Sequence, residues 1–179
     1  MNTIVKPSAD AMGAPKEWDR SGLPAWTYGS DELTEVEKDA LFRRHWQIAC
    51  HVSDVPNPGD YISFDMCGER ALVMRDKEGE VRAFHNLCRH RGARVLAGER
   101  GECPHVITCP FHGWSYNLDG TLRSPAVPSS LPKLDPVEHG LKSIEMEIWH
   151  GFVFLRFLPG DQPSVAKIFE RHEGDHGAG

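Results

Sequence analysis

Two short cysteine–histidine motifs constrain this chain more than any other feature of its sequence. The first is Cys88–His90 and the second is Cys109–His112, and a glycine follows each motif closely, at Gly92 and Gly113. Eighteen residues separate the two motifs. Thiolate and imidazole groups are common ligands of transition metals in proteins. The pattern therefore predicts two ligand loops that share one metal centre.

Two kinds of centre accept two thiolates and two imidazoles. One is a structural zinc site, but zinc modules usually pair Cys with Cys at a spacing of about two to four residues and His with His at about three to five. Here each motif contains one residue of each type. Mixed motifs suit two irons bridged by sulfides, with cysteines on one iron and histidines on the other. The sequence thus favours a [2Fe–2S] cluster on Cys88, His90, Cys109 and His112, with zinc as the alternative.

Composition excludes several other classes of function. The chain has 179 residues, about one domain, and its net charge of -6 provides no positive field for a nucleic-acid backbone. No apolar run approaches the roughly 18 residues of a membrane span, and residues 1–18 lack the apolar centre of a secretory signal. We therefore expect a cytoplasmic protein. In that compartment its five cysteines favour metal ligation over disulfides.

Short runs typical of β-strands fill the middle of the chain. Alternating apolar residues over 46–52 predict a half-buried strand. Further runs between turn signals predict strands at 61–65, 70–75, 81–85, 105–108, 114–117, 121–123, 141–148 and 151–157. The body is therefore predicted to be all-β and antiparallel.

The segments around this body have other patterns. Residues 1–30 contain prolines and glycines without periodicity and predict an extended arm. Thr34 and Glu37 form a possible capping box, which predicts a helix over about 35–44. Four prolines between Pro125 and Pro136 predict a stiff surface loop. After Pro159 the periodicity is lost.

The residues around the two motifs resemble a known family. Phe84–Ala93, Cys109–Tyr116 and Asp119-Gly120 are similar to the Rieske domain of ring-hydroxylating oxygenase alpha subunits. The resemblance covers roughly residues 18–158 and also includes Phe42–Trp46, Pro58–Tyr61 and Gly151–Phe154. The gap of eighteen residues between the motifs is slightly longer than usual, with the extra length expected in the turn at 99–104.

The resemblance implies a fold and a division into segments. The fold is the Rieske iron–sulfur fold of small antiparallel sheets, preceded by an arm and a short helix. Residues 1–45 would form the arm and helix, 46–158 the Rieske [2Fe–2S] domain, and 159–179 a tail or the start of a catalytic domain. That catalytic domain, of the helix-grip type, is absent from this sequence.

The resemblance also implies a function. Electrons from a ferredoxin or a flavin reductase would pass through the cluster to a mononuclear non-haem Fe(II) site, which activates dioxygen for hydroxylation or demethylation. That iron would lie in the missing catalytic domain or in a neighbouring alpha subunit, so this chain contains no catalytic residue and is expected not to oxygenate a substrate alone. The alternative is a stand-alone Rieske ferredoxin, an electron carrier.

Other residues narrow the subtype. Respiratory-chain Rieske proteins have a disulfide where this chain has Ala93 and Phe111, and a serine where it has Trp114. The resemblance therefore implies a potential at the low end of the Rieske range of about −150 to +300 mV. Trp114 is expected to pack beside the cluster. His172 and His176, in a glycine-bordered tail, are not expected to bind iron.

The sequence also allows us to interpret the remaining cysteines and three arginines near the first motif. Cys103 precedes His105 but lies too close to Cys109 for a separate ligand loop, while Cys50 and Cys67 are expected to be small apolar residues of the core or its edge. Two interpretations of the arginines at 89, 91 and 94 stay open. They form either a docking rim for an acidic electron donor or a solvated face.

Overall fold

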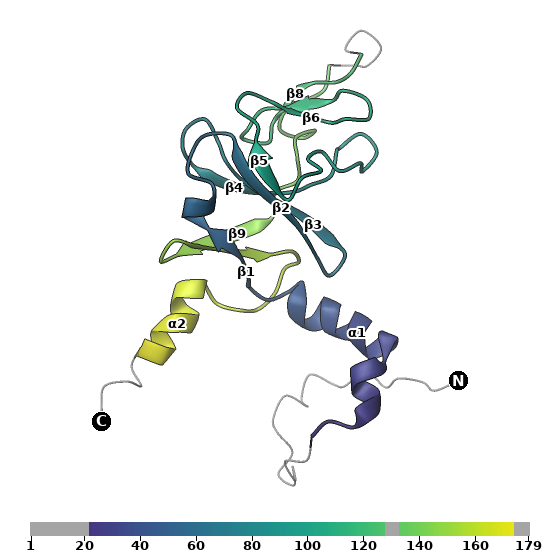
Figure 1. Ribbon diagram of the computed structural model, residues 1–179, viewed down its shortest axis with the longest axis vertical. Helices are drawn as coiled ribbons and strands as arrows, with labels where there is room; N and C mark the ends of the chain where they lie inside the picture. The colour runs from purple at the N-terminus through teal and green to yellow at the C-terminus, as the bar shows by residue number, and fades with distance from the viewer. Residues whose placement is uncertain (1–21, 128–132, 174–179) are drawn as a thin grey trace. The chain divides into compact units, whose positions relative to one another are not determined.

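The computed structural model describes residues 22–127 and 133–173, and the chain divides into two units, 1–35 and 36–179 (Figure 1). The first unit contains a short 3-10 helix, η2 (Ala25–Gly29), where the sequence predicts an extended arm. The amide and hydroxyl of Thr27 both donate to the Pro24 carbonyl, at 2.9 and 2.7 Å. The prediction of an extended arm is therefore wrong for this stretch, and residues 1–21 lie outside the described part of the chain.

The helix predicted at 35–44 begins earlier. Helix α1 spans Asp31–Glu37 and continues as a π-helical segment, η3 (Lys38–Phe42). The predicted cap at Thr34 is wrong, because the Leu33 amide donates to the Ser30 hydroxyl at 3.1 Å and makes Ser30 the N-cap. The Thr34 hydroxyl donates instead to the Ser30 carbonyl, at 3.0 Å.

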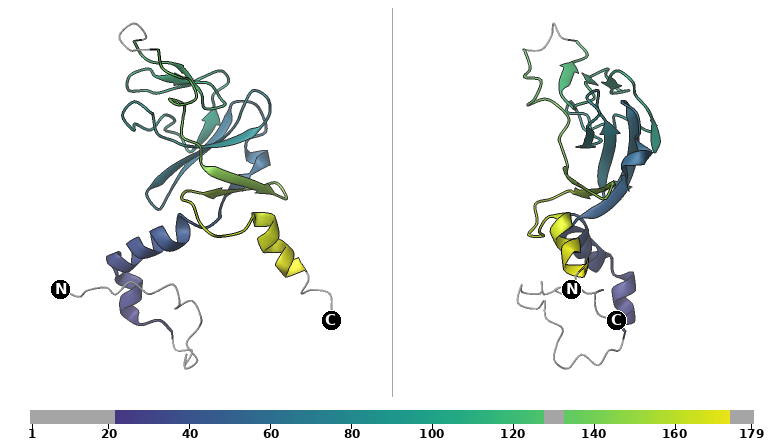
Figure 2. Two further views of the ribbon diagram at one scale, coloured as in Figure 1. Left: turned by 180° about the vertical axis from the view of Figure 1, so that it is seen from behind. Right: turned by 90° about the vertical axis from the view of Figure 1, so that its left-hand side faces the viewer.

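The strands confirm the predicted antiparallel all-β body. Within the described residues they form three antiparallel sheets, and the four-stranded sheet lies between the other two in Figures 1 and 2. One outer sheet has the order β1-β10-β9, with β1 (Gln47–His51), β10 (Phe152–Arg156) and β9 (Glu145–Trp149). The central sheet is β4-β3-β2-β5, with β4 (Val81–His85), β3 (Glu69–Arg75), β2 (Asp60–Met66) and β5 (Arg100–Glu102). The other outer sheet is β6-β7-β8, with β6 (Ile107–Thr108), β7 (Ser115–Tyr116) and β8 (Leu122–Ser124).

Strand β3 organises the interior because both of its faces are buried. Successive side chains of a strand point to opposite faces. Leu72 and Met74 accordingly pack in a first core cluster, and Ala71 and Val73 in a second. The first cluster also contains both motif cysteines. The ligand motifs are therefore anchored in the core rather than held on free loops.

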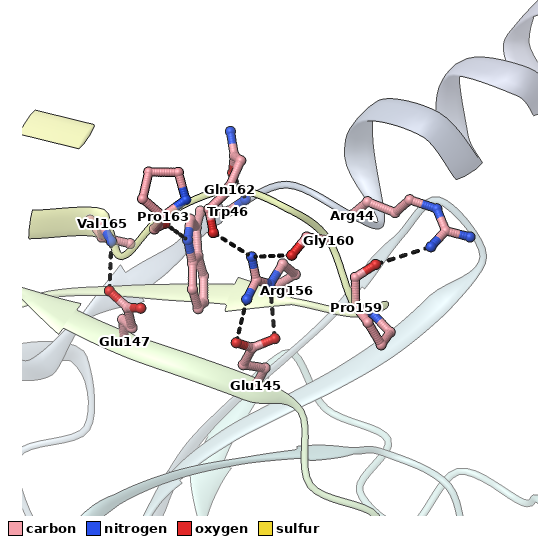
Figure 3. Close-up of polar contacts among 10 residues, drawn as sticks. All are labelled: Arg44, Trp46, Glu145, Glu147, Arg156, Pro159, Gly160, Gln162, Pro163 and Val165. Atoms are coloured by element: carbon pink, nitrogen blue, oxygen red, sulfur yellow. Dashed lines mark hydrogen bonds and ion pairs between the residues drawn. The ribbon is translucent and has the colours of Figure 1, made fainter. Parts of the chain in front are cut away.

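The segment after β10 is held in place by hydrogen bonds, although the sequence predicts an irregular tail from 159. The Arg156 guanidinium donates to both carboxylate oxygens of Glu145 and to the carbonyls of Gly160 and Gln162 (Figure 3). It also lies 4.5 Å from the ring centre of Trp46, whose indole N–H donates to the Pro163 carbonyl at 2.9 Å. We call residues 159–164 the strap.

The strap leads into a helix that the sequence did not predict. Helix α2 spans Val165–Glu173, and the Val165 amide donates to the Glu147 carboxylate at 2.6 Å. The rings of Phe169 and Trp149 stack with their centres 4.4 Å apart. A helix this short is stabilised mainly by packing rather than by its own sequence, and the Phe169–Trp149 contact provides part of that packing. No helix in the described ranges is long and apolar enough to cross a bilayer.

Candidate metal centre

The two cysteine–histidine motifs form loops with the same backbone pattern. In the first ligand loop, residues 88–93, the Cys88 amide donates to the Ala93 carbonyl at 2.7 Å, and the Gly92 amide donates to the Cys88 carbonyl at 2.8 Å. Two bonds between residues at the same offsets close the second ligand loop, residues 109–114, at 2.8 and 3.0 Å. The loops are therefore matched in conformation although their histidines are spaced differently.

The glycine four residues after each cysteine makes this closure possible. Gly92 has a φ of 69° and Gly113 a φ of 71°. A side chain at such a φ is strained, because its Cβ crowds the following carbonyl. The sequence signal of a glycine after each motif therefore has a backbone cause.

The fold sorts the four candidate ligands by type. Cys88 and Cys109 belong to the same core cluster, and they are 3% and 2% exposed. The rings of His90 and His112 lie nearer the surface, edge to face, with centres 4.9 Å apart. All four residues line one cavity of about 360 Å³. No group of three or more His, Cys, Asp or Glu side chains in the described ranges surrounds a single ion position.

His90 is oriented with one nitrogen pointing inward. Its Nδ1 is buried and has no hydrogen-bond partner. The Trp114 ring lies nearly parallel to the His90 ring, at 7° and a centre distance of 5.3 Å, and is itself buried. Burial of the ring lowers the pKa of His90, and the positive charges of Arg91 and His112 lower it further. A neutral imidazole with an unpartnered inner nitrogen is suited to bind a metal.

Tyr116 lies behind the first thiol. Its hydroxyl oxygen is 3.2 Å from Cys88 Sγ and accepts the Arg89 backbone N–H at 3.0 Å. Because that oxygen already accepts a bond, its own proton is free to point at the sulfur. Burial raises the pKa of the Cys88 thiol and the Cys109 thiol raises it further, while Tyr116 and the His90 amide lower it. Binding of a metal would replace the thiol proton.

Asn86 fixes the first ligand loop from inside the core. Its amide nitrogen donates to the Ser63 hydroxyl and to the Leu96 carbonyl, both at 2.7 Å. Its oxygen accepts the backbone N–H groups of Val95 and Leu96, at 3.1 and 3.0 Å. A fully buried amide with satisfied polar atoms holds the two ends of the loop in register.

Sequence reasoning did not identify Asn86 or Tyr116 as parts of the site. Asn86 lies two residues before Cys88, and Tyr116 lies in the short alternating run at 114–117. Those positions indicate burial. The sequence does not indicate which polar atom each side chain meets, because Tyr116 reaches a sulfur 28 residues earlier in the chain.

The other cysteines lie where the sequence predicts. Cys50 is in the second core cluster, and burial raises the pKa of its thiol to about 11. Cys67 is half-buried in the turn between β2 and β3. The Cys103 thiol donates to the Val106 carbonyl at 2.8 Å and does not line the ligand cavity.

The arginines near the first motif have different surroundings. The Arg94 guanidinium is paired with both oxygens of Asp65, at 2.6 Å. Arg91 is exposed and lines the ligand cavity, whereas Arg89 is exposed beside it. The prediction about His172 and His176 concerns side chains outside the described part of the chain.

Comparisons with known proteins find a matching family and similar proteins. Residues 45–139 match the family described as the Rieske [2Fe-2S] domain. The chain is 36% identical over 136 residues to the carnitine monooxygenase oxygenase subunit of Acinetobacter pittii, covering 73% of this chain and 36% of that protein. It is 35% identical over 130 residues to the large oxygenase component of the naphthalene 1,2-dioxygenase system of Pseudomonas aeruginosa, covering 71% and 29%.

A solved structure extends the similarity to three dimensions. The apo form of a quaternary ammonium Rieske monooxygenase matches with a TM-score of 0.76 and 31% identity, over 86% of this chain and 44% of that one. The chain spans about a third of the length of the curated relatives it matches.

Proposed function

Because the chain belongs to the Rieske [2Fe–2S] domain family, we propose that Cys88 and Cys109 bind one iron of the cluster and that His90 and His112 bind the other. The main observation that supports this proposal is that the ligand types are separated in space. The two thiols lie together in the core, and the two imidazoles lie together near the surface. The buried Nδ1 of His90, which has no hydrogen-bond partner, is suited to bind iron. The residues present therefore fit the cluster.

When bound, a cluster of this kind carries one electron. Two neutral imidazoles in place of two thiolates make it easier to reduce than an all-cysteine cluster, because its oxidised form is less negative. Trp114 holds the His90 ring in place, and the buried sulfur end is shielded from water by the first core cluster. The exposed His112 makes the imidazole end the one that an electron acceptor can approach.

The proposed role is the electron-transfer portion of a Rieske oxygenase alpha subunit. The similarity to oxygenase components named for carnitine and naphthalene supports this role. Electrons would come from a ferredoxin or a flavin reductase and pass to a mononuclear non-haem iron in a catalytic domain or a neighbouring alpha subunit. The five cysteines, all free thiols, support a cytoplasmic location.

Metal analysis tests the ligand assignment. We expect the purified, red-brown chain to contain iron and sulfide in equal amounts and, once reduced, to show the electron paramagnetic resonance spectrum of a Rieske cluster. Cys88→Ser and Cys109→Ser should each abolish the signal. Cys103→Ser is the matched control, because a serine hydroxyl can keep the bond to Val106. A colourless zinc protein, or the spectrum of an all-cysteine cluster, would contradict the assignment.

A further inference from the structure

A second cavity, of about 390 Å³, lies beside the first ligand loop. Cys88 and Gly92 line both this cavity and the ligand cavity. The second cavity is also lined by four ionisable side chains, Glu69, His85, Arg89 and Lys142. One wall of the proposed cluster site is thus also the wall of a separate polar hollow, on a side lined by neither candidate histidine.

The acidic group in this cavity already has partners. The Glu69 carboxylate lies 3.5 Å from Arg43 Nε and 3.5 Å from His85 Nδ1. The Arg43 guanidinium also donates to the Cys67 carbonyl, which holds it beside Glu69. The negative charge of Glu69 is therefore compensated from within the chain.

The two basic groups are different. Arg89 and Lys142 are exposed, and neither forms an ion pair with any acidic side chain in the described ranges. Burial lowers the pKa of His85; the charge of Glu69 opposes this effect, and the charge of nearby Lys142 adds to it. The cavity therefore has two uncompensated cations, on a chain whose net charge is -6.

We propose that this cavity receives surface carboxylates of an acidic electron-donor protein, so that electrons enter beside Cys88 and leave through the imidazole end. The inference rests on the proposed cluster. In the step, the donor's reduced carrier loses one electron and the cluster gains one, and no bond is formed or broken. An acidic chain repels an acidic partner at long range. Local cations near the entry point therefore determine where on the surface the donor binds in an orientation that allows electron transfer.

The test is the rate at which two donors of opposite charge reduce the cluster-loaded chain. One donor is a photoreduced plant-type ferredoxin, an acidic protein of about −400 mV. The other is reduced methyl viologen, a small cation. Lys142→Glu is compared with Lys77→Glu, which makes the same charge change at an exposed residue in the turn between β3 and β4 that lines neither cavity.

With ferredoxin at low salt, we expect Lys142→Glu to slow reduction by about tenfold, as for loss of electrostatic steering. High salt should remove most of this difference. Lys77→Glu should slow the same reaction by less than about twofold, and viologen should reduce all variants at least as fast as the unmodified chain. Arg89→Gln, whose cluster content is checked by its absorption spectrum, should act in the same direction as Lys142→Glu.

Two results would overturn the inference. Equal effects of Lys142→Glu and Lys77→Glu on ferredoxin would mean that only net charge matters. Slower reduction of Lys142→Glu by viologen as well would indicate a damaged cluster rather than lost docking. If the unmodified chain shows no cluster signal, the proposed function itself fails, and this result is distinct from either of the others.

Discussion

Replacing Tyr116 with phenylalanine should lower the reduction potential of the proposed cluster. The change removes only the hydroxyl group. Its oxygen lies 3.2 Å from Cys88 Sγ, and the Tyr116 side chain is fully buried. A bond donated to sulfur stabilises the reduced cluster more than the oxidised one, because the added electron increases the negative charge on its ligands. Hydrogen bonds to the sulfurs are among the factors that set the potential of iron–sulfur clusters.

The magnitude follows from the worth of one hydrogen bond. Its net contribution is about 0.5–1.5 kcal/mol. For a one-electron couple, 59 mV corresponds to a tenfold change in equilibrium constant, or about 1.4 kcal/mol. If the whole bond energy is gained on reduction, Tyr116→Phe should lower the potential by roughly 20–65 mV. The variant also leaves the Arg89 amide without its acceptor, which should decrease the free energy of unfolding by about 1–3 kcal/mol.

Protein-film voltammetry at fixed pH measures the shift, and thermal unfolding measures the loss of stability. Tyr61→Phe is the control, because the Tyr61 ring packs against the same core cluster while its hydroxyl lies against Gly101. An unchanged or raised potential in Tyr116→Phe, with the cluster content intact, would show that the hydroxyl does not donate to the sulfur. The same reasoning would fail if Tyr61→Phe lowered the potential equally.

Four further outcomes are expected. The cluster potential should lie at the low end of the Rieske range and fall as pH rises through ionisation of the oxidised cluster's imidazoles, and a pH-independent voltammogram would contradict this. Burial lowers the pKa of His85, so between pH 7 and 5 the unfolded chain takes up its proton first and stability falls; His85→Gln should flatten that decline in urea titrations. Gly92→Ala and Gly113→Ala should each cost about 1–2 kcal/mol by urea unfolding, through backbone strain alone, since no atom lies within 4 Å of either added Cβ. Arg156→Lys should lower stability by about 1–3 kcal/mol in thermal scans, because an ammonium cannot replace the forked contacts to Glu145 and the strap, whereas the exposed Arg123→Lys should have little effect.

The sequence predicts the parts of this fold whose signals are local. Strand β4 is predicted residue for residue at 81–85, because the turn signal Glu78-Gly79 precedes this short β-type run. The candidate ligands are recognisable because cysteine, histidine and glycine occur together at fixed offsets. The structure places all four in one cavity.

The parts that sequence reasoning missed depend on contacts between distant residues. Helix α2 is only nine residues long, and its position depends on Trp149 and Glu147 of strand β9. Ser30 and Thr34 are both able to cap a helix, so residue type alone does not decide which of them begins it. Strand β5 is fully exposed and has no apolar alternation, so only its pairing with β2 identifies it as a strand.

Strand β5 belongs to the eighteen residues that separate the two motifs. The extra length was expected in the turn at 99–104, and there the chain forms β5 and pairs with β2. The Cys103 amide then donates to the Gly59 carbonyl at 2.8 Å. Gly59 has a φ of 95°, and an added Cβ there would lie 2.7 Å from the Cys103 carbonyl oxygen, so the approach requires glycine.

Strand β5 thus lies at the edge of the central sheet and outside both ligand loops, where an inserted residue would lengthen the gap between the motifs. An insertion of this kind changes the distance between the motifs in the sequence without changing the two backbone bonds that close each loop. It follows that motif spacing is a weak constraint on such a centre, whereas the cysteine-to-glycine offset within each loop is a strong one. Lengthening 99–102 by one residue should be tolerated by the ligand cavity, but inserting a residue between Cys88 and Gly92 should destroy it.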